Sequence, residues 1–256
     1  MDERVRRIDS GLRAGWQAQV LATGRGLVAE RDGLLLALSG VADETLNPGL
    51  VVREPVDPVA ALAWSTSVRR AHGVPGDGFD VAEGAHPVFE RAMTAAGYRE
   101  LVRRPGCAAA VKSVAVPASG DLQVDVVGDA AGLAAYRAVQ VEVFGWTPET
   151  AAQWVTAPLV ADPAMALLVG RVGGEIVGAA AGSLHQGAVG VFGVCVTEGR
   201  RRRGYGAALT AAVVTWGAER GADLAWLQAS ELGLPVYLAM GFEVVRDYVV
   251  WTTPSP

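Results

Sequence analysis

An arginine-rich turn with two glycines is the stretch of this chain best suited to bind an anion. It runs from Arg200 to Gly206, after an apolar run that ends at Val196 and before an apolar helical pattern. The first turn of a helix carries unpaired backbone N–H groups and the positive end of the helix dipole. Glycines leave that backbone open, and the arginines add charged donors. The sequence therefore predicts a site for a phosphate or pyrophosphate at this turn.

The elements around this turn must hold it between a strand and a helix. Residues 191–196 form a short apolar run rich in β-branched residues, which predicts a strand. The helical pattern after the turn stops at Gly221, a residue type common just beyond a helix end. Downstream, residues 222–227 predict another strand, and Tyr237 lies in a further predicted helix.

Two blocks in this region resemble the signatures of the GNAT superfamily of acyl-CoA-dependent N-acetyltransferases. The first is similar to the family pattern (Q/R)-x-x-G-x-(G/A) and reads Arg201-x-x-Gly204-x-Gly206. The second resembles the family block N-x-x-A-x-x-x-Y-x-x-x-G-F, with Ser for Asn and Gly for Ala, and reads Ser230-x-x-Gly233-x-x-x-Tyr237-x-x-x-Gly241-Phe242. The context of strand, turn and helix supports both matches.

The resemblance implies the GNAT fold, an α/β (α+β) architecture in which helices flank a central mixed, mostly antiparallel twisted sheet. The first half of the chain ends a predicted helix with Ala95-Ala96-Gly97-Tyr98, which is similar to Ala239-Met240-Gly241-Phe242, but it has no arginine-glycine turn. We therefore predict a tandem protein of two GNAT-like halves. Residues 122–254 form the catalytic domain, and residues 1–118 form a degenerate, partial domain without a CoA site. An unrelated α/β cap is the alternative for the first half.

Acetyl-CoA is the acetyl donor that the resemblance implies. In the family, the pantetheine arm lies beside the fourth strand, which falls on residues 190–196 here, and the pyrophosphate lies at the turn. The predicted cofactor-binding residues are Val194, Cys195, Val196, Arg201, Arg202, Arg203, Gly204, Tyr205, Gly206, Ala207, Ser230 and Tyr237. A main-chain N–H of Val194 or Cys195 is the expected donor to the oxyanion.

Transfer of an acetyl group from a thioester to an amine needs a neutral amine and a proton for the departing thiolate. Tyr237 matches the position of the family's general acid; a tyrosine packed in the core is the alternative. Some members carry a glutamate base on the fourth strand, at the place that falls on Gly190 here, and glycine cannot accept a proton. Glu142 and His185 are the substitute bases to test. The alternatives are a solvated glutamate, a loop histidine and deprotonation through water.

Phe144 and Trp146, with Tyr136, lie near the loop that gates the acceptor pocket in the family. They favour an apolar or aromatic face for the acceptor, although aromatic residues at a helix end are as often core. The predicted function is transfer of acetyl from acetyl-CoA to a primary amine by direct attack through a tetrahedral intermediate. The acceptor is a small-molecule or peptide amine that the sequence does not identify. The alternative is a CoA- or ligand-binding module without turnover.

Composition argues against several other classes. Hydrophobic residues make up 51% of the chain and charged residues 19%, which predicts a sizeable core. A net charge of −5 argues against nucleic-acid binding by the arginines. Cys107 and Cys195 have no metal-like spacing, and no metal is expected. Because the acidic start is unlike a signal peptide and no apolar run reaches ~18–20 residues, we expect a cytoplasmic monomer or homodimer without membrane partners.

The remaining elements follow from hydrophobic periodicity and turn residues. For the first half these patterns predict helices over 4–23, 58–72 and 87–96, strands over 34–38, 50–52, 98–103 and 107–114, a loop over 73–80 and a linker at 117–120. For the second half they predict a strand over 122–127, helices to about Leu159, a hairpin of 165–172 and 176–184 closed by Gly173-Gly174, and a last strand over 242–252.

Overall fold

The computed structural model describes residues 2–116 and 120–253, so most of the predicted linker lies outside the described residues. The chain forms two compact units. The first comprises Met1–Gly15 with Gly106–Val245, and the second comprises Trp16–Pro105 with Arg246–Pro256. Both units therefore combine a long continuous segment with a short piece from elsewhere in the sequence. The predicted division into a CoA-binding part at 122–254 and a part without CoA at 1–118 stays a prediction.

The first unit contains a mixed sheet flanked by helices. Its strands lie in the order β5-β10-β9-β8-β7-β6. They are β5 (Arg99–Ala110, of which 106–110 lie in this unit), β6 (Gln123–Val126), β7 (Met165–Val172), β8 (Glu175–His185), β9 (Ala188–Val196) and β10 (Leu224–Gln228). β9 and β10 run parallel, and the other neighbours run antiparallel.

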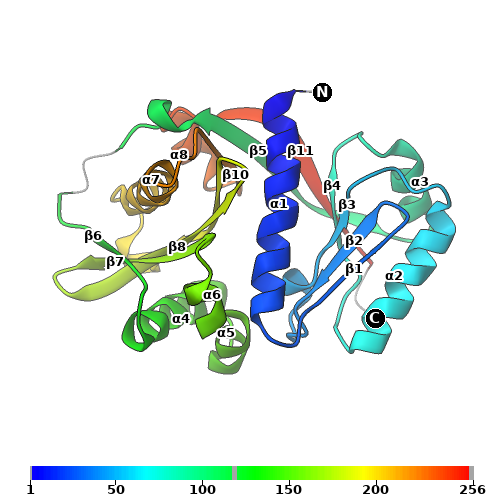
Figure 1. The fold of residues 1–256 in the computed structure, drawn as a ribbon, viewed down its shortest axis with the longest axis horizontal. Helices are drawn as coiled ribbons and strands as arrows, with labels where there is room; N and C mark the ends of the chain where they lie inside the picture. The colour runs from blue at the N-terminus through cyan, green and yellow to red at the C-terminus, as the bar shows by residue number, and fades with distance from the viewer. Residues whose placement is uncertain (1, 117–119, 254–256) are drawn as a thin grey trace. The chain divides into compact units, whose positions relative to one another are not determined.

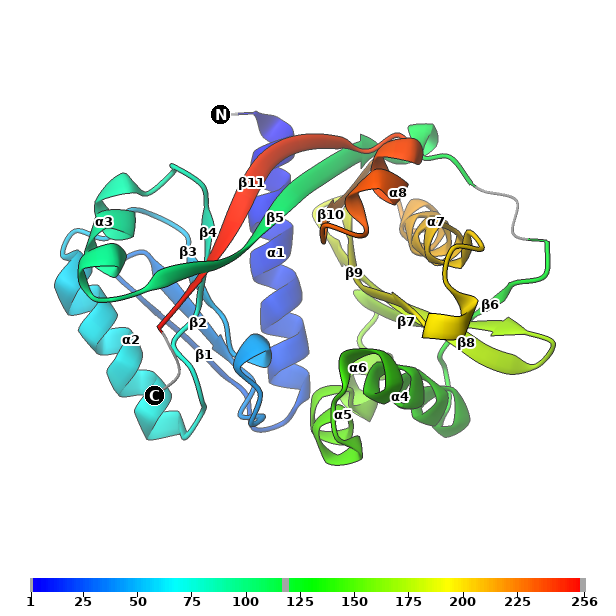
Figure 2. The same ribbon diagram turned by 180° about the vertical axis from the view of Figure 1, so that it is seen from behind.

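Helices cover both faces of this sheet (Figure 2). On one face lie α7 (Tyr205–Ala218) and α8 (Leu234–Ala239). On the other lie α4 (Ala130–Phe144), α5 (Pro148–Trp154) and α6 (Ala157–Ala161). Buried residues of α7, among them Leu209 and Val213, share one hydrophobic core with residues of β8, β9 and β10. The helix is apolar almost all round because it lies deep in this core.

The second unit has strands in the order β1-β2-β3-β4-β11 (Figure 1). They are β1 (Leu27–Arg31), β2 (Leu34–Leu38), β3 (Gly49–Val51), β4 (Phe79–Ala82) and β11 (Glu243–Thr252, of which 246–252 lie in this unit). Its helices α2 (Pro58–His72) and α3 (Pro87–Ala95) share a core with the sheet. Phe79 and Phe89 meet edge to face in that core, with ring centroids 5.4 Å apart.

The same series of elements occurs twice along the chain. Each series consists of a hairpin, a third antiparallel strand, a helix, a parallel strand, a helix and a last strand. The first series is β1-β2-β3-α2-β4-α3-β5, and the second is β7-β8-β9-α7-β10-α8-β11. The last strands are exchanged: β5 pairs with β10, and β11 pairs with β4. The predicted two-half architecture is confirmed, and the similar segments 95–98 and 239–242 lie at the same step of both series.

Most predicted elements are confirmed within a few residues, and the helix over 58–72 is confirmed at both ends. Its cap Asp57 accepts a hydrogen bond from the Ala60 amide at 3.0 Å, and Gly73 follows it with φ 68°. The prediction of separate strands over 98–103 and 107–114 is wrong, because β5 is continuous through Pro105. Proline keeps an extended φ and loses only a donor, so a strand can continue where that donor is not needed.

Strands β1 and β4 were not predicted from the sequence. The first is short and ends in charged residues, and the second has only 4 residues after a segment rich in glycine and proline. Both are fixed by pairing with neighbours, β1 with β2 and β4 with β11. Pairing with a neighbouring strand thus determines strand formation where the local sequence predicts a strand only weakly.

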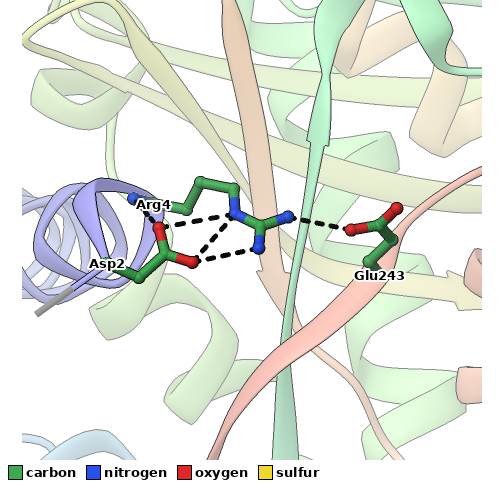
Figure 3. Close-up of polar contacts among 3 residues, drawn as sticks. All are labelled: Asp2, Arg4 and Glu243. Carbon is green, nitrogen blue, oxygen red and sulfur yellow. Dashed lines mark hydrogen bonds and ion pairs between the residues drawn. The ribbon is translucent and has the colours of Figure 1, made fainter.

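Helix α1 (Glu3–Ala22) begins in the first unit and is tied to the start of β11 (Figure 3). The Arg4 guanidinium donates to Asp2 at 3.0 Å and to Glu243 at 2.9 Å. Exposed ion pairs of this kind contribute at most about 1 kcal/mol. Close packing holds the helix more firmly: a Cβ on Gly11 would lie 2.7 Å from Nε1 of Trp226, so glycine lets the helix rest on that buried indole.

Candidate functional site

Strand β9 bulges where the predicted pantetheine contacts lie. The register of β8 with β9 shifts by one residue between the pairs Ala179↔Cys195 and Ala181↔Phe192. The extra residue belongs to β9, where Gly193 has φ +56°, a conformation that favours glycine. The described register of β9 with β10 ends at Val191, although β9 continues to Val196. The last part of β9 therefore offers backbone groups along the edge that faces β10.

The side chains after the bulge alternate between the two faces of the sheet. Val194 and Val196 pack against the core that contains α7. Cys195 is buried on the opposite side, where the Gln140 amide lies 3.6 Å from its sulfur. Burial raises the pKa of the Cys195 thiol to about 12. The cysteine is thus a buried, protonated thiol, and the predicted contacts at these positions are backbone contacts.

Both thiols are expected to resist modification in the folded protein. Cys107 is fully buried and Cys195 is 5% exposed, and a protonated thiol is a poor nucleophile. Ellman's reagent added to native protein should therefore release almost no chromophore over minutes, whereas both thiols should react in guanidinium chloride. Rapid labelling of the native protein at Cys195, located by peptide mass spectrometry, would contradict the packing of α4 on β9.

The predicted anion turn lies between β9 and α7. A short 3₁₀ turn, Glu198–Arg200, leads into Arg202, with φ +60°, and Gly204, with φ +81°. Gly204 is the N-cap of α7, and no side chain caps the first turn of this helix. The N–H groups at the start of α7 have no acceptor within the helix. The turn therefore presents backbone donors and the positive helix end together.

The arginines of this turn differ in their surroundings. Arg200 forms an ion pair with Glu175 of β8. Arg201 donates from Nε to the Val196 carbonyl at 3.2 Å, which fixes the end of β9. Arg202 and Arg203 are exposed. These last two are the side chains of the turn best placed to bind phosphate oxygens.

The side chains of Tyr205 and Ser230 both form hydrogen bonds within the protein, and their predicted contacts with CoA stay predictions. The Tyr205 hydroxyl donates to Asp121 at 2.7 Å, so its side chain anchors the helix start and only its backbone N–H belongs to the turn. The Ser230 hydroxyl accepts from the Gly233 amide at 3.1 Å and caps the turn before α8.

Tyr237 lies on α8 against the α7 face of the sheet. Its half-buried ring meets Phe242 with centroids 6.1 Å apart. Burial raises the pKa of its hydroxyl above the ordinary value of 10, and a hydrogen bond with Thr210 of α7 opposes that shift. A Cβ on Gly233 would lie 2.8 Å from Cε2 of this ring. This contact explains why glycine replaces the family's alanine in this chain.

The two substitute bases lie in different places. Glu142 is exposed on α4. It follows Gln140, whose amide faces Cys195, by two residues, so the two side chains lie on different sides of the helix. His185 ends β8, with Nε2 3.1 Å from the Ser10 hydroxyl. Its partner in the sheet is Ala188, at the other end of β9 from the turn, roughly 25 Å away at about 3.3 Å per residue. His185 therefore lies away from the bulge of β9, and Glu142 lies on an exposed side of α4.

Gly190, where some family members carry glutamate, has no room for any side chain. A Cβ there would lie 2.5 Å from Cζ2 of Trp226. Trp226 is 1% exposed and also meets the Phe192 ring edge to face, with centroids 5.3 Å apart. The Trp226 indole thus fills the space that the side chain of a base would need at this position.

Two residues of α4 complete the surroundings of the bulge. A Cβ on Gly193 would lie 3.7 Å from the Tyr136 hydroxyl and 3.8 Å from the Gln140 amide nitrogen. Sequence analysis placed Tyr136 only near the aromatic loop and missed Gln140. Tyr136, Gln140 and Phe144 lie four residues apart, so they form one stripe of the helix, and this spacing was the available signal. The Phe144 ring meets that of Trp146 at a tilt of 39°, with ring centroids 5.2 Å apart.

The second unit has a groove of about 1000 Å³ between α2 and α3. In the repeated series of elements, this groove corresponds to the space between α7 and α8. Its walls include Leu62, Thr66 and Tyr98. The start of α2 differs from that of α7, because the Asp57 carboxylate caps it and Pro58 follows as the first helical residue. A negative charge thus occupies the position where a phosphate would bind.

Comparisons with known proteins agree with this geometry. Residues 133–242 match the model of the Acetyltransferase (GNAT) family. The fold is similar to that of a GCN5-related N-acetyltransferase from Kribbella flavida, with TM-score 0.73, 23% identity and 96% of both chains covered. A GCN5-related N-acetyltransferase from Sphaerobacter thermophilus gives TM-score 0.62 and 18% identity, covering 88% of this chain and 78% of that one. No curated protein matches the chain in sequence.

A tandem GNAT protein from the clavulanic acid biosynthesis pathway also shares the fold, with TM-score 0.57, 15% identity, and coverage of 87% of this chain and 79% of that one. These likenesses extend the shared fold through both repeated series.

Over residues 2–116 and 120–253, no helix has the length and apolar character needed to cross a membrane. Within the same residues, His, Cys, Asp and Glu side chains form no cluster of three or more suited to a metal ion.

Proposed function

Residues 133–242 match the GNAT family of acetyltransferases, and from that premise we propose that the chain transfers the acetyl group of acetyl-CoA to a primary amine by direct attack. One observation carries the proposal. The bulged end of β9, whose register with β10 stops at Val191, leads directly into the uncapped, glycine-bearing start of α7. This arrangement supplies a free strand edge for an extended amide-containing arm and backbone donors for a pyrophosphate.

Different groups at the turn and on β9 bind different parts of acetyl-CoA. The N–H groups at the start of α7 donate to the pyrophosphate, and Gly204 and Gly206 leave them open. Arg202 and Arg203 add exposed charged donors for phosphate oxygens. The backbone of Val194, Cys195 and Val196 pairs with the amides of the pantetheine arm.

Tyr237 is the proposed general acid. As the C–S bond breaks, the thiolate of CoA takes the phenolic proton. Burial keeps this hydroxyl protonated, because it raises the pKa above the ordinary value. The attacking amine loses its proton to water or to the exposed carboxylate of Glu142 on α4. His185 has no part in this scheme, because its partner Ala188 is at the far end of β9.

The acceptor is proposed to be a small-molecule or peptide amine carried on an apolar or aromatic body. Phe144 is 45% exposed and its ring meets that of Trp146, and exposed aromatic pairs bind apolar groups and cations. We further propose that residues 1–118 bind no CoA. The Asp57 carboxylate at the start of α2 repels a phosphate at the position equivalent to the anion turn.

Substitution of Tyr237 by phenylalanine is expected to lower kcat by about 10²–10⁴-fold, because a positioned general acid contributes that much. The dissociation constant of acetyl-CoA should change less than about threefold, since the ring remains. In the unsubstituted protein, kcat should not fall on the alkaline side until the pH exceeds 10, the ordinary pKa of tyrosine. Thiol release from acetyl-CoA with a panel of primary amines measures kcat, and calorimetry measures binding.

Tyr98→Phe is the matched control, because it removes the hydroxyl of another buried tyrosine, in the second unit. It should leave kcat unchanged. If acetyl-CoA binds but no amine releases thiol, the protein is a ligand-binding module. If acetyl-CoA does not bind, the proposed function fails.

A further inference from the structure

The hydroxyl of Tyr136 is a polar group of α4 that the proposed function does not yet use. The residue is 4% exposed. Among the described residues this hydroxyl has no hydrogen-bond partner. Its oxygen is not fully enclosed, unlike Nε1 of Trp226, which is both enclosed and without a partner. A phenol held in a buried ring, with an accessible and unsatisfied oxygen, is available to a ligand.

This hydroxyl is directed at the bulge of β9. The position of a Cβ on Gly193 lies 3.7 Å from the Tyr136 oxygen, and Gly193 is exposed. The next two residues are Val194 and Cys195, whose main-chain N–H groups are the expected oxyanion donors. The thiol of Cys195 lies close enough to act on the pKa of Tyr136. The hydroxyl and these backbone donors therefore meet at one short segment of β9.

The surroundings keep Tyr136 a hydrogen-bond donor. Burial raises its pKa well above the ordinary value of 10, and the nearby Cys195 thiol raises it further. Cys195 stays protonated as well, since burial raises its own pKa to about 12. Neither group holds a negative charge at neutral pH, so nothing here opposes a developing oxyanion.

We propose that the Tyr136 hydroxyl is a second donor to the thioester carbonyl oxygen, beside the main-chain N–H of Val194 or Cys195. The inference rests on the proposed function. When the amine nitrogen attacks the carbonyl carbon, the C=O π pair moves to oxygen, and Tyr136 donates a hydrogen bond to that charge without giving up its proton. When the C–S bond breaks, the pair returns to the carbonyl, and the thiolate takes its proton from Tyr237.

The test uses infrared difference spectra of the whole protein saturated with acetyl-CoA, unlabelled and labelled with ¹³C at the carbonyl. A donor to the carbonyl oxygen lowers the C=O stretching frequency. In Tyr136→Phe the band should move back toward that of free acetyl-CoA, while the dissociation constant changes less than about threefold. With an amine that releases thiol, kcat should fall about 10²–10³-fold, the usual cost of losing one oxyanion donor.

The fold should tolerate this change, because the hydroxyl satisfies no other described group. An unchanged thermal unfolding midpoint verifies that point, and Tyr98→Phe should leave the C=O band where it is. An unshifted band in Tyr136→Phe with acetyl-CoA bound overturns this inference and leaves the proposed function standing. Failure of the unsubstituted protein to bind acetyl-CoA overturns both.

Discussion

Gly204→Glu is expected to weaken acetyl-CoA binding by at least about 10²-fold, which corresponds to about 2.7 kcal/mol. The variant places a carboxylate at the N-cap of α7, where the backbone donors would otherwise meet a pyrophosphate. The new charge occupies the positive end of the helix dipole and repels the phosphates. Two effects thus act in the same direction at the one position that the proposed site needs open.

The fold should survive this substitution. A Cβ on Gly204 would have no atom of its surroundings within 4 Å, so no clash arises. Its φ of +81° costs a non-glycine residue about 1–2 kcal/mol, which the interaction of the carboxylate with the helix dipole offsets in part. The thermal unfolding midpoint should therefore fall by only a few degrees, and the loss of binding reports on the site.

Two matched variants separate charge from strain. Gly199→Glu adds the same charge to the same turn at a glycine with open space around it and no positive φ, and it should weaken binding only slightly. Gly204→Ala adds the strain without the charge, and it should weaken binding less than the glutamate does. Titration calorimetry measures all three. Unchanged acetyl-CoA affinity in Gly204→Glu would show that the anion site lies elsewhere.

Local signals in the sequence were enough for several parts of the fold and site. Asp57 and Gly73 bound α2 because a carboxylate caps the first turn and a glycine adopts the left-handed conformation after the last. Gly173 and Gly174 close the hairpin with φ of 57° and 86°. Gly204, with φ of 81°, is another glycine whose residue type indicates its local backbone conformation. In each case a few adjacent residues determine the geometry, so their types reveal it.

Other features depend on contacts between distant segments. The bulge at Gly193 depends on the register between β8 and β9. A glycine inside a strand is compatible with a bulge, but it does not by itself show which strand pairing produces one. The same register sends His185 to the far end of β9, which its place in the hairpin did not reveal. Gly190 lacks a side chain because Trp226, 36 residues later in the sequence, fills the space. Such constraints become visible only when the strands are paired.

The exchange of last strands leads to the second large effect: residues 122–254 alone are expected not to fold. The first compact unit also contains residues 1–15 and the strand segment 106–110. Without that segment β10 loses its antiparallel partner, and without α1 the indole of Trp226 loses the helix that covers it at Gly11. The buried side chains removed with these pieces are Val5, Ile8, Leu12, Cys107, Ala108 and Ala109.

The free energy lost with these pieces is comparable to the stability of a whole domain. Burying one large aliphatic side chain contributes about 1.5–3 kcal/mol, and whole domains are stable by only about 5–15 kcal/mol. Loss of the pieces that carry Ile8, Leu12 and Val5, together with the β5 pairing, therefore removes about as much free energy as the fold has. The fragment should be insoluble or should lack a cooperative thermal transition in far-UV circular dichroism.

Co-expression of residues 1–121 with 122–254 is the matched control, because it restores every missing segment without restoring the covalent link. The two pieces should copurify and unfold cooperatively, since the pairing of β5 with β10 and the contact of Gly11 with Trp226 need no continuous chain. Cooperative unfolding and acetyl-CoA binding by 122–254 alone would contradict this expectation. That result would mean that one repeat is self-sufficient and that the exchanged strands add little to its stability.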